Sequence, residues 1–142
     1  MNLQRDCGYV KTIGIANGAA VSSTGGDTAG EIDLKNWAGG LILVPSAWTA
    51  ADITFSVAPY SSLAAVQSGL GRKKPAPTFS PLFDKVGVLV RITTIATSAA
   101  QWYEVPAQVF MGAVVKIHST NTASAAAVNQ GAARTLQLLR KS

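Results

Sequence analysis

The sequence predicts an all-β fold, and three observations carry this prediction. About eight to ten segments have the length and composition of short strands. Turn residues separate them at intervals of about 8–12 residues, and helical periodicity is almost absent. This pattern is typical of an antiparallel β-sandwich or barrel. Within that class we expect a jelly roll of about eight strands with at most one or two short helical turns, because a jelly roll protects its own sheet edges.

The chain is expected to begin with an arm and to continue as a single domain over residues 9–142. Residues 1–8 carry too little apolar surface to pack alone, so they predict an N-terminal arm or a frayed terminus. Residues 9–15 have strand character, residues 23–27 have loop composition, and residues 31–34 alternate as a strand with their two apolar side chains inward.

Residues 39–59 predict two core strands joined by a short crossover. Residues 41–44 form a continuous apolar run of strand length, and residues 53–58 alternate between apolar and small or polar side chains. Alternation with a period of two places one face of a strand on a core. The linker between the strands is too short for an ordinary helix, so we expect one helical turn there, with Trp48 covering an end of the core.

Three acidic residues, Asp27, Glu31 and Asp33, lie close together in the sequence. Carboxylate oxygens can bind calcium, but this spacing matches no EF-hand loop. We therefore expect these residues to form a solvated edge rather than a metal site.

Residues 60–81 interrupt the strand pattern as a long, basic, proline-rich loop. Ser62 opens a segment with the spacing of a short amphipathic helix and is its expected cap. The prolines that follow exclude a regular helix or a central strand. Arg72, Lys73 and Lys74 form a basic run that either meets an acidic protein surface or is solvated. The glycines before this run lack the Walker spacing, so no phosphate-binding loop is predicted.

The second half of the domain predicts four further strands. The longest covers residues 86–95, whose even-numbered residues share one face as far as Ile92. Shorter strands are expected at residues 102–105 and 112–118, and a closing strand at residues 134–140. Residues 120–131 are expected to form a loop with at most one turn.

Catalytic and metal-binding motifs are absent from the sequence. It contains no GxSxG, HExxH, CxxC or GxGxxG pattern, one histidine, His118, and one cysteine, Cys7. His118 has no second metal-ligating residue near it in the sequence. We therefore expect no enzyme activity, no metal and no cofactor. A single thiol suits a reducing compartment.

The composition favours a surface that is partly covered by partners. Hydrophobic residues make up 48% and charged residues 13% of the chain, against about 25% charged in an average domain. An alternative is a surface rich in small residues. The net charge of +5 is dispersed and lacks interleaved aromatic residues, so no nucleic-acid partner is expected. No apolar window of about 18 residues and no signal peptide are present, so no membrane partner is expected.

Two runs of the sequence carry a resemblance to a known family. Residues 44–55, VPSAWTAADITF, and residues 125–138, with VNQ before RTL, look like a pattern common in small proteins encoded beside capsid genes. The likeness covers roughly residues 37–59 and 84–140. On these runs the chain resembles the small capsid decoration, or cement, proteins of tailed bacteriophages, in particular short-tailed, podovirus-type phages.

The resemblance implies a jelly-roll protein that binds the major capsid protein and stabilises the shell. Such proteins act as homodimers or other small homo-oligomers that clamp adjacent capsomers. The implied location is the exterior of the virion capsid, after assembly in the cytoplasm of the host bacterium. We hypothesise that the arm and the basic loop contact the capsid, through Met1, Asn2, Leu3, Gln4, Arg5, Arg72, Lys73 and Lys74.

Two alternatives stay open at this stage. One is a carbohydrate-binding jelly-roll module of a phage tail fibre or baseplate, which would need an exposed aromatic platform. Trp37, Trp48 and Trp102 are the candidate rings, but each lies at the end of a predicted strand, where core packing is expected. The other is a connector or adaptor protein of the phage tail, which would form a ring.

Overall fold

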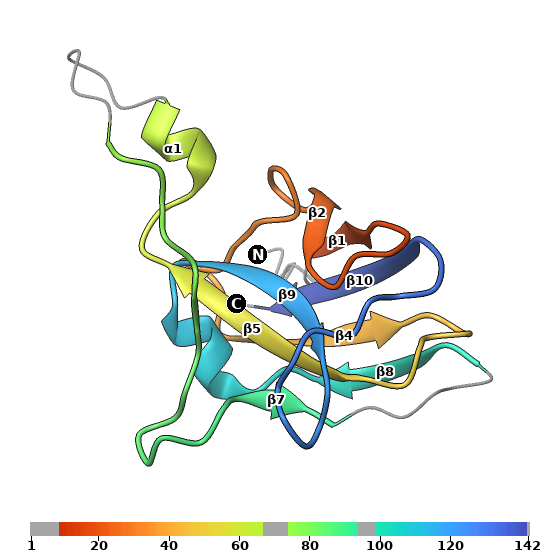
Figure 1. The fold of residues 1–142 in the computed structure, drawn as a ribbon. Coiled ribbons are helices and arrows are strands. Elements are labelled where there is room, and N and C mark those ends of the chain that lie inside the picture. Colours follow the sequence, from red (N-terminus) through yellow and green to blue (C-terminus); the bar gives the residue numbers. More distant parts are fainter. Residues whose placement is uncertain (1–8, 67–73, 94–98, 142) are drawn as a thin grey trace, which may run out of the picture.

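The computed structural model describes residues 9–66, 74–93 and 99–141 and shows two antiparallel sheets around one core (Figure 1). The first sheet has the order β2-β1-β10-β4-β8. Its strands are β1 (Tyr9–Ile15), β2 (Ser22–Gly25), β4 (Gly39–Val44), β8 (Gln101–Glu104) and β10 (Arg134–Lys141). The second sheet has the order β3-β9-β5-β6, and β7 also pairs with β5. Its strands are β3 (Ile32–Asp33), β5 (Asp52–Ala58), β6 (Ser80–Pro81), β7 (Arg91–Ile92) and β9 (Val114–Thr120).

The strand order is that of a jelly roll. The runs β1-β10-β4-β8 and β3-β9-β5-β6 face one another, and the chain passes between the sheets after most strands. This arrangement contains the interleaved Greek keys of an eight-stranded jelly roll. The predicted antiparallel all-β sandwich is therefore confirmed. The additional strand β2 and the division of one edge strand into β6 and β7 bring the described strands to ten.

Alternating side chains from both sheets form the core. In the first sheet Ile13 and Leu136 point inward, and in the second sheet Ile53, Phe55 and Ile117 do so. All five side chains are fully buried or nearly so. A period of two along each strand thus supplies one apolar face per sheet, as the sequence predicted for β5 and β10.

Helical structure in the described residues consists of α1 (Ser62–Val66) and the 3-10 helix η1 (Ala107–Met111). Ser61, rather than the expected Ser62, caps α1, because its Oγ accepts the Ala64 N–H at 3.0 Å. No helix in these ranges is long and apolar enough to span a bilayer.

The predicted long strand over residues 86–95 is wrong for its described part, and its last two residues lie outside the described residues. Arg91 and Ile92 form β7, Leu89 bridges to Phe83, and the residues before them form a tight turn. Asp84 Oδ1 accepts the backbone N–H groups of Val86 and Val88, both at 2.9 Å. Gly87 has φ +83°, a left-handed conformation that glycine adopts without steric cost. Both valines therefore point into solvent.

Two smaller predictions are also wrong. Residues 45–51 form a turn with Ala47 at φ +58° rather than a helical turn. Trp48 is nevertheless buried as expected, and its indole N–H donates to the Ala51 carbonyl oxygen at 3.2 Å. Residues 23–25 belong to β2 rather than to a loop, because β2 pairs with β1.

Candidate functional site

The hypothesised capsid-contact residues lie mostly outside the described residues. This holds for Met1, Asn2, Leu3, Gln4, Arg5, Arg72 and Lys73. Lys74 is described and exposed, and its Nζ lies 5.0 Å from the centroid of the Tyr60 ring. The Tyr60 hydroxyl in turn donates to the Pro75 carbonyl oxygen at 2.7 Å. This end of the basic loop is therefore held against Tyr60, just after β5.

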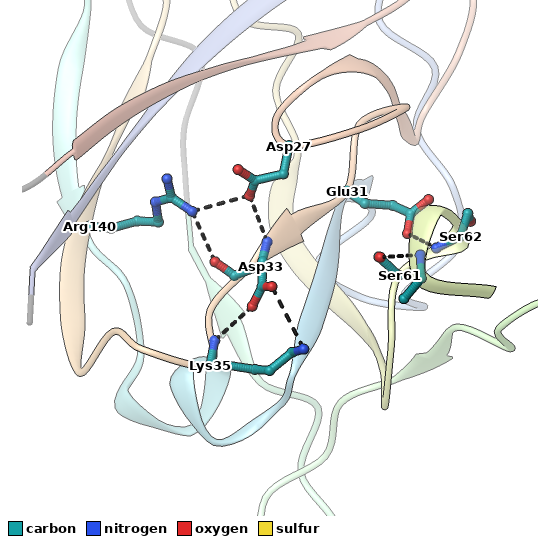
Figure 2. A network of polar contacts seen from close by, with 8 residues as sticks. Asp27, Glu31, Asp33, Lys35, Ser61, Ser62 and Arg140 are labelled. Carbon is teal, nitrogen blue, oxygen red and sulfur yellow. Dashed lines mark hydrogen bonds and ion pairs between the residues drawn. The ribbon is translucent and has the colours of Figure 1, made fainter. Parts of the chain in front are cut away.

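The three clustered acids form hydrogen bonds and ion pairs that connect neighbouring segments. Asp27 Oδ2 accepts the Asp33 backbone N–H at 2.8 Å and Arg140 Nη1 at 3.1 Å, as Figure 2 shows. Its Oδ1 pairs with Lys11 Nζ at 3.2 Å. The Arg140 guanidinium is buried and lies 4.8 Å from the centroid of the Trp37 ring. No group of three possible metal ligands occurs among the residues that the structure describes.

Glu31 corrects the expectation of a solvated edge. It is buried, and its Oε1 accepts the Ser62 backbone N–H at 2.9 Å (Figure 2). This bond satisfies a free donor at the start of α1. The acids thus connect the loop before β3 to β10 on one side and to α1 on the other.

A small hairpin interrupts the edge of the second sheet. The Leu82 N–H donates to the Phe55 carbonyl oxygen at 3.0 Å, and the Val90 N–H donates to the Leu82 carbonyl oxygen at 2.9 Å. Residues 83–89 therefore leave the sheet and return to it, and the Asp84 turn closes the excursion. Figure 1 shows this segment as a green loop between the long connection that follows α1 and strand β7.

The helix η1 forms the opposite wall of a groove beside this hairpin. Val109 anchors η1 in the core, whereas Met111 points outward. A Cβ atom at Gly112 would lie 2.8 Å from Val57 Cγ1, so glycine permits the close approach of η1 to β5. The resulting hairpin groove has a volume of about 520 Å³ and is lined by Val57, Leu82, Phe83, Asp84, Lys85, Val86, Gln108, Met111 and Gly112.

Large apolar side chains around the hairpin groove are exposed. The exposed fractions are 53% for Phe83, 74% for Val86, 56% for Val88 on the same hairpin, and 86% for Met111. A contiguous exposed apolar patch marks an interaction site more often than singly scattered residues do. The groove can therefore bind an apolar surface by excluding water from it.

A second, smaller pocket shares Phe83 with the hairpin groove. This His118 pocket has a volume of about 170 Å³ and is lined by Thr54, Phe55, Ser56, Pro81, Phe83, Leu89, His118, Thr120 and Ala125. Ser56 Oγ and His118 Nε2 lie 2.7 Å apart. His118 lies within β9, opposite Thr54, rather than at the end of the strand as predicted. Burial, and secondarily the nearby Lys116 ammonium, lower the pKa of His118 below its ordinary value of 6.5.

The lowered pKa of His118 predicts a loss of stability at acidic pH. Between the folded-state pKa and 6.5, the unfolded chain binds more protons than the folded chain does. The free energy of unfolding should therefore fall as the pH drops from about 7.5 through this range. Urea unfolding at several pH values measures this, with His118→Asn as the comparison. The variant should show a shallower pH dependence, and equal slopes in both proteins would contradict the assignment.

The three tryptophans differ in their environments. Trp48 is buried, Trp37 is partly buried against the Arg140 guanidinium, and Trp102 is 46% exposed on the edge strand β8. The expectation that all three pack in the core is therefore wrong for Trp102. One exposed ring on an edge strand is not the platform of several rings that a carbohydrate-binding face would need.

Comparison with known proteins identifies no relative. No protein family, curated protein or solved structure matches this chain significantly. The structure therefore defines the class of the protein by its fold alone, an antiparallel jelly-roll sandwich with an exposed apolar groove and a second, smaller pocket. The resemblance to phage cement proteins stays a prediction.

Proposed function

We propose that this chain is a structural protein of a bacteriophage virion, a cement protein that bridges adjacent major capsid proteins on the exterior of the shell. The exposed hairpin groove is the observation that carries this proposal. It offers apolar contact area on a rigid sandwich, next to a loop that the structure holds in place with the Asp84 turn. The sequence resemblance supplies the capsid as the partner.

Burial of the groove can supply useful binding energy. Full burial of one large apolar side chain contributes about 1.5–3 kcal/mol, and Phe83, Val86 and Met111 are each more than half exposed. The loss of translational and rotational freedom on binding offsets much of the free energy that burial of these three side chains would contribute. A homodimer or another small homo-oligomer, which we also propose, would present two or more grooves and gain effective concentration at its second contact.

The charge around the groove favours an acidic capsid surface. The Asp84 carboxylate accepts hydrogen bonds from two backbone N–H groups of its own turn. Lys85, in contrast, is exposed at the groove. The chain as a whole carries a net charge of +5. Complementary charge speeds association and selects among partners more than it adds affinity. The shell becomes more stable by mass action, because the protein binds the assembled lattice.

The double variant Val86→Ser/Met111→Ser tests the groove. Both side chains are largely exposed, so the melting temperature should stay within about 2 °C of the wild-type value. Occupancy on shells assembled from the cognate major capsid protein should fall by at least tenfold. A sedimentation assay with quantified bound protein measures this loss.

Two matched controls and two further variants complete the experiment. Val10→Ser and Leu63→Ser remove exposed apolar side chains outside the groove and should leave occupancy unchanged. Deletion of residues 1–8, and neutralisation of the basic run 72–74, test the two earlier contact hypotheses separately. Unchanged occupancy in the groove variant, or an equal loss in both controls, would contradict the groove as the contact. A ring-sized mass in solution would instead favour the tail-connector alternative.

A further inference from the structure

We propose that a second copy of this chain binds along the open edge of strand β8, so that the first sheets of two copies join into one continuous sheet. The inference deepens the proposed function, because it rests on the homodimer suggested there and gives that dimer an interface. This interface uses β8 (Gln101–Glu104), which contributes no residue to the described lining of the hairpin groove.

Strand β8 differs from the other sheet edges that the structure describes. Proteins protect exposed edge strands with bulges, prolines, charged residues or very short strands, because unpaired backbone groups bind further strands. In the first sheet, the opposite edge strand β2 is irregular, with a register shift against β1 after Gly14. In the second sheet, β3 has two residues, β6 contains Pro81, and the hairpin separates β6 from β7. β8 has four regularly paired residues and neither proline nor lysine (Figure 1).

The backbone of β8 directs four hydrogen-bonding groups toward its open edge. The Val105 N–H donates to the Gly40 carbonyl oxygen at 3.0 Å, so these two residues form a hydrogen-bonded pair that continues the β4–β8 ladder. Hydrogen-bonded and non-hydrogen-bonded pairs alternate along an antiparallel ladder. Tyr103 is therefore hydrogen-bonded to β4, whereas the N–H and C=O groups of Trp102 and Glu104 point away from β4. No described strand pairs with that side of β8.

An antiparallel pair of β8 strands centred on Tyr103 satisfies all four of these groups in each copy. In this register Trp102 lies opposite Glu104 of the second copy, and both such pairs exchange two backbone hydrogen bonds. The arrangement has two-fold symmetry and closes on itself, so it gives a dimer rather than a filament. It also keeps the two Glu104 carboxylates apart, whereas a register centred on Glu104 would place like charges directly opposite each other.

Apolar side chains on the outer face of the first sheet lie beside this edge. Trp102 is 46% exposed, and Leu43 of β4 lies opposite it. In the next row, Leu41 lies opposite Leu139 of β10, which lies opposite Val10 of β1. Val10 is 51% exposed, and the three leucines are partly buried. In the proposed dimer, Trp102 is the diagonal neighbour of Trp102 of the second copy, a separation that aromatic side chains can span. Pairing therefore removes apolar surface from water as well as satisfying the backbone.

The length of β8 predicts a weak dimer. Stable protein–protein interfaces bury about 1,200–2,000 Å² in total. β8 has four residues and extends over only about 14 Å, so the strand pair lies at or below the lower end of that range. We therefore expect a dissociation constant of about 10–100 µM. On a shell, the high effective concentration at the second contact compensates for this weakness.

A charge substitution on β8 tests both the partner and the register. Trp102→Glu places two glutamates opposite each other at both ends of the strand pair and should raise the dissociation constant by at least about tenfold. Adding Glu104→Lys turns each of these pairs into a glutamate–lysine pair and should lower the dissociation constant again by at least about threefold. Sedimentation velocity between about 1 and 500 µM protein measures the dimer in each case.

Two controls separate this interface from the hairpin groove. Thr24→Glu adds the same charge to an exposed position of β2, at the far edge of the first sheet, and should dimerise as the wild type does. Val86→Ser/Met111→Ser should also dimerise normally, whatever its effect on capsid occupancy. A wild-type chain that stays monomeric, a Trp102→Glu variant that dimerises normally, or a second substitution that recovers no dimer would each overturn the β8 interface. None of these results would alter the occupancy test of the groove.

Discussion

Replacing Trp48 by alanine is expected to lower the free energy of unfolding by about 3–5 kcal/mol. The Trp48 side chain is almost completely buried, and its indole N–H bonds to the Ala51 carbonyl oxygen. The variant would lose the buried apolar area, leave a cavity and leave that carbonyl without its indole partner. Because domains of this kind are stable by about 5–15 kcal/mol in total, the loss would be a large fraction of the whole.

Urea unfolding followed by far-UV circular dichroism measures the Trp48→Ala effect without relying on tryptophan fluorescence. Trp102→Ala is the matched control, because it removes the same side chain from an exposed position on β8. The control substitution should lower the free energy of unfolding by about 1 kcal/mol or less. Equal losses in the two variants would contradict the assignment of Trp48 to the core.

Replacing Arg91 by leucine is expected to lower the free energy of unfolding by about 3–5 kcal/mol. Arg91 Nη1 lies 3.1 Å from Asp52 Oδ2 and also donates to the Thr122 carbonyl oxygen at 2.8 Å. The Asp52 side chain is fully buried, and its other oxygen, Oδ1, has no partner among the described residues. The variant would therefore leave a buried carboxylate without its cation, which costs more than the ion pair itself contributes.

A double variant distinguishes the stranded charge from lost packing. Asp52→Asn combined with Arg91→Leu removes both charges and should recover part of the stability that Arg91→Leu loses. Lys35→Met serves as a control, because Lys35 and Asp33 are both about half exposed and their ion pair measures 3.9 Å. This control substitution should lower the free energy of unfolding by about 1 kcal/mol or less. An Arg91→Leu protein as stable as the wild type would show that Asp52 does not depend on this partner.

The sequence predicted correctly those strands in which alternating apolar residues leave only one face that can be turned toward the core. In β10, Leu136 and Leu138 lie on either side of Gln137 and face the core, as expected. Ile32 and Leu34 are likewise buried as predicted. A one-residue shift in register would expose such residues, so alternation on a half-buried strand is a strong signal.

The failure at residues 86–95 has a local cause. The even-numbered apolar residues fit a strand, but Asp84 and Gly87 provide the chemistry of a tight turn within the same stretch. Turn formation leaves Val86 and Val88 exposed, and this exposure helps to create the hairpin groove. A side-chain acceptor followed three residues later by glycine was the signal that could have revealed the hairpin.

The His118 pocket could not be predicted from the sequence. Ser56 and His118 are 62 residues apart and meet only because β5 and β9 pair in one register. The burial of Glu31 depends in the same way on α1, which lies far along the chain. Local patterns carry no information on such long-range contacts, although they predicted the strands that make them.

The central claim is that this jelly roll binds neighbouring proteins in a viral shell through the hairpin groove. Under this proposal a bacteriophage genome encodes the chain, and cryo-electron microscopy of the virions of that phage tests the claim most directly. We expect regularly spaced copies on the outer surface of the shell, with residues 83–89 and Met111 against the major capsid protein. Copies confined to the tail, absence from the particle, or a groove that faces solvent on every copy would contradict it.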